Sequence, residues 1–114
     1  MTMGAYLNYP QSRGSIHITS KDPGVPPEFD AGFLSAEVDI APQILAYKMN
    51  REIVRRMSCF DEEYAPSVPP FGSDSPALNG KSSDATMDFE YSEDDDKVLA
   101  QWIKHGVETA WHSM

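Results

Sequence analysis

Three histidines and one cysteine are the side chains of this sequence best suited to chemistry at neutral pH. The histidines, His17, His105 and His112, are too scattered to define a zinc site, and no metal site is expected. Cys59 has no cysteine partner in the chain, and a lone thiol is more often inert than catalytic. Spacing leaves one candidate, His112, which follows Trp111 in a stretch suited to a strand. Histidines at strand ends are usually structural, so spacing alone favours that role.

The segment that must position His112 is predicted to be an amphipathic helix that a glycine ends. Ser92 suits the N-cap, and the acidic residues 93–96 complement the positive end of the helix dipole. Gly106 can adopt the left-handed conformation that stops a helix. Residues 107–112 then alternate as a strand. One apolar stripe at helical spacing would face the core, and it consists of Val98, Leu99, Trp102 and Ile103.

A second helix is expected within residues 36–57, starting near Asp39 so that Pro42 falls in its first turn. Its apolar residues recur every fourth position and are interpreted as core: Ala41, Leu45, Met49, Ile53 and Met57. Its basic residues are interpreted as a solvated face: Lys48, Arg51, Arg55 and Arg56.

The remaining segments are predicted to be a strand, an extended stretch and a loop. Residues 15–19 alternate, which predicts a half-buried strand with Ile16 and Ile18 inward. Phe29 and Phe33 are expected at the edge of the core. Residues 58–87 are rich in Pro, Gly, Ser and Asp, and this long irregular stretch is predicted to be a flexible loop within one domain, residues 1–114.

Composition excludes several function classes. The 114 residues carry a net charge of −9, which argues against nucleic acid and against an anionic membrane surface. No apolar run approaches the roughly 20 residues of a membrane helix, and no secretory signal or other targeting signal is visible. An intracellular location is therefore expected.

Two long stretches of the sequence match a known family pattern. Residues 9–23, YPQSRGSIHITSKDP, are similar to the pattern P-x-S-R-G-x-[IV]-x-[IL]-x-S-x-D-P, which opens the later part of the substrate domain in the glucose–methanol–choline (GMC) oxidoreductases, and residues 27–35 continue the match. Residues 108–113, ETAWHS, resemble the family pattern E-T-T-W-H. Residues 41–42, 46–48 and 55–57 are similar to the fungal alcohol (methanol) oxidase branch.

This resemblance implies the fold class α+β: a fragment of an antiparallel-sheet substrate domain with two main helices and a long irregular loop. It also implies an FAD enzyme that oxidises a small primary alcohol with oxygen. His112 matches the active-site histidine that faces the flavin and accepts the alcohol hydroxyl proton as hydride passes to the flavin. Trp111 matches the aromatic residue that narrows the alcohol pocket. The resemblance therefore implies that Trp111 contacts the substrate and that both Trp111 and His112 contact the cofactor. The branch that the chain resembles is peroxisomal. The sequence leaves open whether the chain is part of an oligomer.

Departures from the family pattern suggest that this chain alone is an incomplete enzyme. The dinucleotide-binding glycine motif and the second active-site residue, an Asn or a His, are missing, and Ala110 replaces a Thr. The hypothesis is that the chain by itself neither binds FAD nor turns over. The alternatives are a non-catalytic interaction module that docks on a full-length oxidase, and an alcohol dehydrogenase of the same superfamily.

Overall fold

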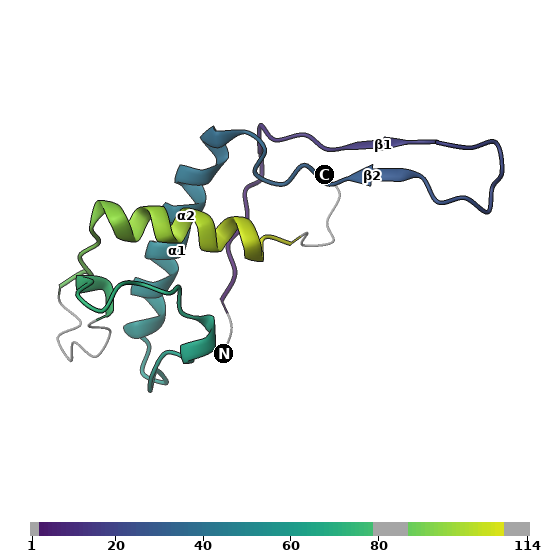
Figure 1. The fold of residues 1–114 in the computed structure, drawn as a ribbon. Coiled ribbons are helices and arrows are strands. Elements are labelled where there is room, and N and C mark those ends of the chain that lie inside the picture. Colours follow the sequence, from purple (N-terminus) through teal and green to yellow (C-terminus); the bar gives the residue numbers. More distant parts are fainter. Residues whose placement is uncertain (1–2, 79–86, 109–114) are drawn as a thin grey trace.

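The structure is a computed structural model that describes residues 3–78 and 87–108 (Figure 1). The described residues form two helices and one antiparallel pair of strands, the α+β combination expected. The strands are β1 (Ser15–His17) and β2 (Glu28–Asp30), and the helices are α1 (Ile40–Arg55) and α2 (Glu93–Gly106). Short 3-10 turns occupy Glu37–Asp39, Ala65–Ser67 and Pro76–Leu78.

The two helices cross and enclose a small core (Figure 1). Leu99 of α2 is fully buried against Phe71 and Ala77, which come from the segment that connects the helices. Tyr47 of α1 contacts Trp102 of α2 edge to face, with ring centroids 5.5 Å apart. The inward apolar stripe predicted for α2 is therefore confirmed.

The ends of α2 follow the sequence signals in part. Ser92 is the N-cap, and it forms a capping box with Asp95, because each side chain accepts from the other residue's backbone N–H. Gly106 is the last residue of α2 rather than a left-handed stop, and Gly32 is the one described glycine with a positive φ. Val107 and Glu108 are not in a strand, and the rest of that predicted strand lies outside the described residues.

The strands β1 and β2 form an arm that projects from the helices (Figure 1). Ile16 pairs with Phe29 in the antiparallel register, so the two side chains share one face of the arm. The prediction that Ile16 and Ile18 point inward and that Phe29 and Phe33 meet the core is wrong, because all four side chains are exposed. The arm extends away from the helices, so nothing in the described chain covers this face.

The base of the arm depends on two glycines. The backbone of Gly32 has φ +59°, and a Cβ atom there would lie 2.2 Å from the carbonyl oxygen of Arg13. A Cβ atom at Gly14 would lie 2.3 Å from the carbonyl oxygen of Asp30. These two positions let the strands approach closely where the arm leaves the body.

The start of α1 agrees with the prediction, whereas its core face does not. Asp39 precedes the helix and Pro42 lies in its first turn. The predicted core stripe is exposed instead, over Ala41, Leu45, Met49, Ile53 and Met57. The helix buries its other side, which carries Ile44, Tyr47 and Arg51, because α2 and the connecting segment pack there.

The connecting segment is irregular but partly packed. Pro69, Phe71 and Ala77 are buried in it, and its predicted flexibility over residues 58–87 stays a prediction. Neither described helix is long and apolar enough to cross a lipid bilayer.

Candidate functional site

The two residues that the sequence nominates for chemistry, His112 and Trp111, lie outside the described residues. The structure does describe the element that leads to them, since α2 ends at Gly106, a few residues before Trp111. Three features fix α2: the buried Leu99, the contact of Trp102 with Tyr47, and the capping box at Ser92. The contacts that hold α2 in place therefore determine where the segment that carries Trp111 and His112 begins.

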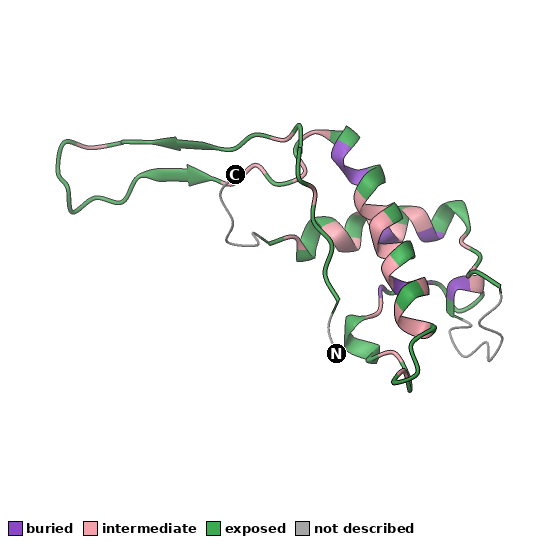
Figure 2. Cartoon of the chain, turned by 180° about the vertical axis from the view of Figure 1, so that it is seen from behind, coloured by how far each residue is buried: buried purple, intermediate pink, exposed green. Residues whose placement is uncertain are grey.

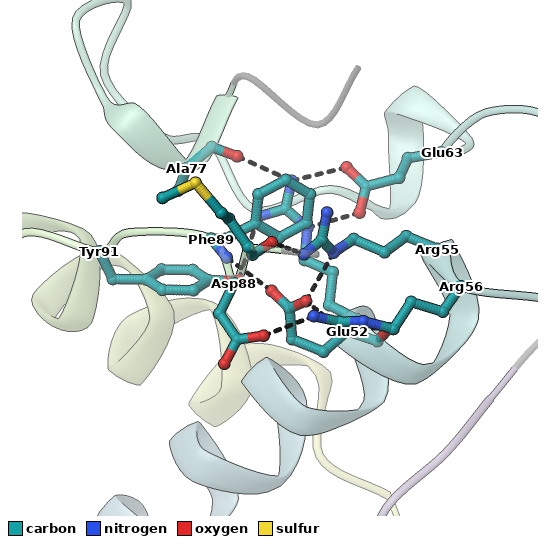
Figure 3. A network of polar contacts seen from close by, with 10 residues as sticks. Glu52, Arg55, Arg56, Glu63, Ala77, Asp88, Phe89 and Tyr91 are labelled. Atoms are coloured by element: carbon teal, nitrogen blue, oxygen red, sulfur yellow. Dashed lines mark hydrogen bonds and ion pairs between the residues drawn. The ribbon is translucent and has the colours of Figure 1, made fainter. Parts of the chain in front are cut away.

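At the centre of these contacts is Arg51 of α1, which is only 6% exposed. Its guanidinium donates two hydrogen bonds to the carboxylate of Glu63, at 2.5 and 2.7 Å. It also donates to the carbonyl oxygen of Ala77 at 2.8 Å and to the hydroxyl of Tyr91 at 3.2 Å. One side chain thus ties three points of the segment between the helices to α1. Figure 3 labels these three partners, Glu63, Ala77 and Tyr91.

Aromatic rings complete the environment of Arg51. Its guanidinium carbon lies 4.4 Å from the centroid of the Phe89 ring, a cation–π distance. Arg55 lies 4.5 Å from the same ring. Figure 3 shows the Phe89 ring among the arginine side chains. Residues 87–91, which immediately precede the N-cap of α2, are therefore held against the last turns of α1.

A second carboxylate, Glu52, organises the outer part of this network (Figure 3). It accepts hydrogen bonds from the backbone N–H of Phe89 at 2.7 Å and from Arg55 at 2.5 Å. Arg56 also donates to Glu52, and it pairs with Asp88 at 2.6 Å. Arg55 donates to the carbonyl oxygen of Met87 as well.

The pKa shifts in this network follow from its pairing. Burial would raise the pKa of Glu52, but the N–H of Phe89 and the two arginines hold it below its ordinary range. Burial would likewise lower the pKa of Arg51, but the hydrogen bonds with Glu63 and Tyr91 raise it. Burial raises the pKa of Tyr91. Arg51 and Glu52 are thus both held in their charged forms, so neither is poised as an acid or base.

A separate carboxylate, Asp39, fastens the N-terminal segment to the start of α1. It accepts from the backbone N–H groups of Gln11 and Ser12, at 2.9 and 2.7 Å, and from the Ser12 hydroxyl. The Ser12 hydroxyl in turn accepts from the N–H of Ala36 at 3.0 Å. The hydrogen bond from Gln11 and that from the Ser12 side chain hold the pKa of Asp39 below its ordinary value.

The other candidate side chains are not brought together. His17 is exposed on the arm, and Cys59 is exposed just after α1. His105 is exposed in the last turn of α2, with its Nδ1 2.8 Å from the carbonyl oxygen of Gln101. Within residues 3–78 and 87–108, no group of three His, Cys, Asp or Glu side chains could hold a metal ion.

The described residues do not provide a cradle for FAD. A dinucleotide phosphate binds at a glycine-rich helix start, where backbone N–H groups point at the anion. The start of α2 carries four acidic residues, 93–96, which repel an anion. The start of α1 contains Pro42, which lacks an N–H, and follows Asp39. Neither helix start therefore fits a pyrophosphate.

Sequence reasoning missed the role of Arg51 and Arg55. Both were assigned to a solvated face, whereas the Arg51 and Arg55 side chains are 5% and 4% exposed. The available signal was Phe89 and Tyr91, two aromatic residues beside acidic ones, which suit stacking with guanidinium groups.

Comparison with known proteins places the chain in a family. The family described as GMC oxidoreductase matches residues 10–114. Alcohol oxidase 1 of Komagataella phaffii is 34% identical over 156 aligned positions, which cover the whole chain and 24% of that relative. Alcohol oxidase of Pichia angusta is 32% identical with the same coverage. An oxygen-dependent choline dehydrogenase of Photobacterium profundum is 30% identical over 105 residues, which cover 92% of this chain and 15% of that relative.

The chain therefore belongs to the GMC oxidoreductase family, an oxidoreductase family that uses FAD. It spans about a quarter of the length of the alcohol oxidases that it matches. The 156 aligned positions exceed the 114 residues of the chain, so those relatives contain additional residues inside the matched stretch.

Proposed function

We propose that this chain contributes part of the substrate domain of an FAD-dependent alcohol oxidase. The observation that carries the proposal is the similarity of the whole chain to alcohol oxidases, at 34% identity to the one from Komagataella phaffii. In this proposal a small primary alcohol is oxidised with oxygen as the acceptor. A peroxisomal location and an oligomeric assembly belong to the same proposal.

Two residues carry the chemistry in this proposal. His112 accepts the proton of the alcohol hydroxyl, a task suited to an imidazole whose pKa lies near neutrality. Trp111 forms a wall of the alcohol pocket and contacts the cofactor. The described contacts support this assignment indirectly, because α2, which precedes both residues, is anchored at its cap and along its buried stripe.

The cofactor must be held mainly by polypeptide outside this chain. The two described helix starts do not suit a pyrophosphate, and the chain matches only about a quarter of its alcohol oxidase relatives. We therefore expect that residues 1–114 mixed with FAD show no flavin absorbance that elutes with the protein. Tight binding would contradict this part of the proposal.

The experiment that tests the function inserts this chain into an alcohol oxidase relative. The matched region of an alcohol oxidase relative is replaced in frame by residues 1–114, and oxygen uptake is measured with small primary alcohols. General-base catalysis contributes about 10²–10⁴-fold, so His112→Asn should lower kcat by that factor. His105→Asn is the matched control, because His105 is an exposed histidine on the preceding helix. Equal activity of the two variants would refute the assignment of His112.

A second candidate function is a non-catalytic interaction module that docks on a full-length oxidase. The exposed apolar face of α1 favours it as a candidate. It predicts that the chain binds an intact oxidase relative while the in-frame replacement gives no alcohol-dependent oxygen uptake.

A further inference from the structure

The face of α1 turned away from α2 is apolar and uncovered. We define the outer stripe as four large side chains, each more than a third exposed: Leu45, Met49 and Ile53 of α1, and Met57, which follows the helix. From behind, α1 lies in front of α2, and exposed segments recur along it (Figure 2). Single exposed apolar residues are normal on a protein surface, but a continuous row of four marks an interaction site.

A hollow deepens this surface. It has a volume of about 360 Å³ and lies between α1 and residues 88–91. Leu45, Met49 and Ile53 contribute apolar surface from α1, and Phe89 and Tyr91 contribute it from the facing segment. Three charged residues also line the hollow: Lys48, Glu52 and Asp88. Side chains that fill a pocket of the partner and exclude water from it are typical hot spots of protein interfaces. The outer stripe is therefore shaped to receive a side chain.

The total exposed area of the chain indicates how much of its surface another polypeptide could cover. A compact protein of 12.7 kDa exposes about 6,200 Å², whereas this chain exposes 8978 Å². Its radius of gyration is 17.9 Å, against about 13 Å for a compact domain of this length. Large permanent interfaces bury about 2,000–5,000 Å² over both partners, so an excess of roughly 2,700 Å² on this one chain is enough for its share of such an interface.

A second copy of this chain does not account for that excess. The 16 residues of α1 make a seam about 24 Å long and about 10 Å wide, or a few hundred Å² per copy. For two copies the seam amounts to about 480 Å², which is below the roughly 1,200 Å² that a stable interface buries over both partners. Such a pairing would also leave the apolar face of the arm, with Ile16 and Phe29, uncovered.

We propose that the outer stripe and its hollow dock against the remaining polypeptide of the oxidase, which inserts an apolar side chain between Met49 and Phe89. This inference rests on the proposed function. Two observations support this choice of docking partner. The uncovered surface is large, and about three quarters of the length of the alcohol oxidase relatives lies outside the matched region. The stripe is thus a domain contact that this chain presents rather than a part of its own core.

The test uses the in-frame replacement in an alcohol oxidase relative, with flavin absorbance of the purified protein as the readout. Met49→Lys places a charge in the hollow, where the two carboxylates of the lining, Glu52 and Asp88, are already paired with Arg55 and Arg56. Burying a further charge there is costly. We expect the yield of flavin-loaded protein to fall about tenfold or more. Tyr64→Lys is the matched control, because Tyr64 is 73% exposed and lies outside the stripe and the hollow; its yield should stay within about twofold of the parent.

A measurement on residues 1–114 alone separates docking from folding. Met49 is 55% exposed in this chain, so Met49→Lys should leave its urea midpoint close to that of the parent. A replacement protein with Met49→Lys that retains flavin as well as the parent overturns the inference and leaves the proposed function intact. A large loss of stability in the isolated chain also overturns it, because Met49 would then belong to this chain's own core. A parent replacement that holds no flavin contradicts the proposed function itself.

Discussion

Replacing Arg51 with alanine should destabilise the chain more than any surface substitution. Arg51→Ala removes both donors of the Glu63 carboxylate pair and the donor of the Ala77 carbonyl oxygen. It also removes the guanidinium from the Phe89 ring. The segment between the helices would then lose its main attachment to α1.

The magnitude follows from burial. Removing one partner of a buried ion pair costs about 3–5 kcal/mol, because the other charge is left without compensation. The Glu63 side chain is 26% exposed, so water can hydrate part of the carboxylate after the substitution. A loss of about 2–4 kcal/mol in the free energy of unfolding is therefore expected. Arg51→Lys keeps the charge but lacks the planar fork, and should lose roughly half as much.

Urea unfolding followed by tryptophan fluorescence measures this loss. Small proteins lose about 1–3 kcal/mol per molar urea, so Arg51→Ala should lower the midpoint by about 1 M or more. Lys97→Ala is the control, because Lys97 pairs with Asp94 on the exposed face of α2 and such pairs contribute about 0–0.5 kcal/mol. If both variants unfold at the same midpoint, the reasoning about Arg51 is refuted.

Three further predictions test the core, the arm and the charged network. Leu99→Ala empties a fully buried position and should cost about 2–4 kcal/mol, measured by the urea midpoint; a cost below about 1 kcal/mol would contradict the core assignment. Gly32→Ala forces a Cβ atom against the Arg13 carbonyl at positive φ, so amide exchange of residues 15–17 should accelerate, and unchanged exchange would exclude the strain. The pKa values of Glu52 and Asp95 are lowered by folding, so the unfolded chain binds more protons below about pH 5. The urea midpoint should therefore fall as the pH drops from about 5 to 2, and a flat profile would count against these pairs.

The parts of the fold that depend on local interactions are predictable from the sequence. The N-cap of α2 at Ser92 and the inward position of Leu99 follow from residues within a few positions of each other. The start of α1 follows from the backbone chemistry of Pro42. Local signals determine helix limits because caps and turns involve neighbouring backbone groups.

The role of Arg51 could not be predicted in the same way. Its partners Glu63, Ala77 and Tyr91 lie 12, 26 and 40 residues away in the sequence. Their arrangement depends on how the connecting segment folds over α1, which no periodicity reports. The nomination of His112 and Trp111 came from family resemblance rather than spacing, and these residues stay outside what the described structure tests.

The two errors about burial have a common physical cause. Hydrophobic periodicity predicts that a face will be buried, but it does not say which polypeptide buries it. Ile16 and Phe29 share one face of the arm, and Leu45 and Met49 share one face of α1, so both patterns are regular. Both faces are exposed in this chain. Exposed apolar rows of this kind are typical of interaction surfaces. Under the docking proposal made above, the mistaken core assignments are therefore faces that another part of an intact oxidase covers.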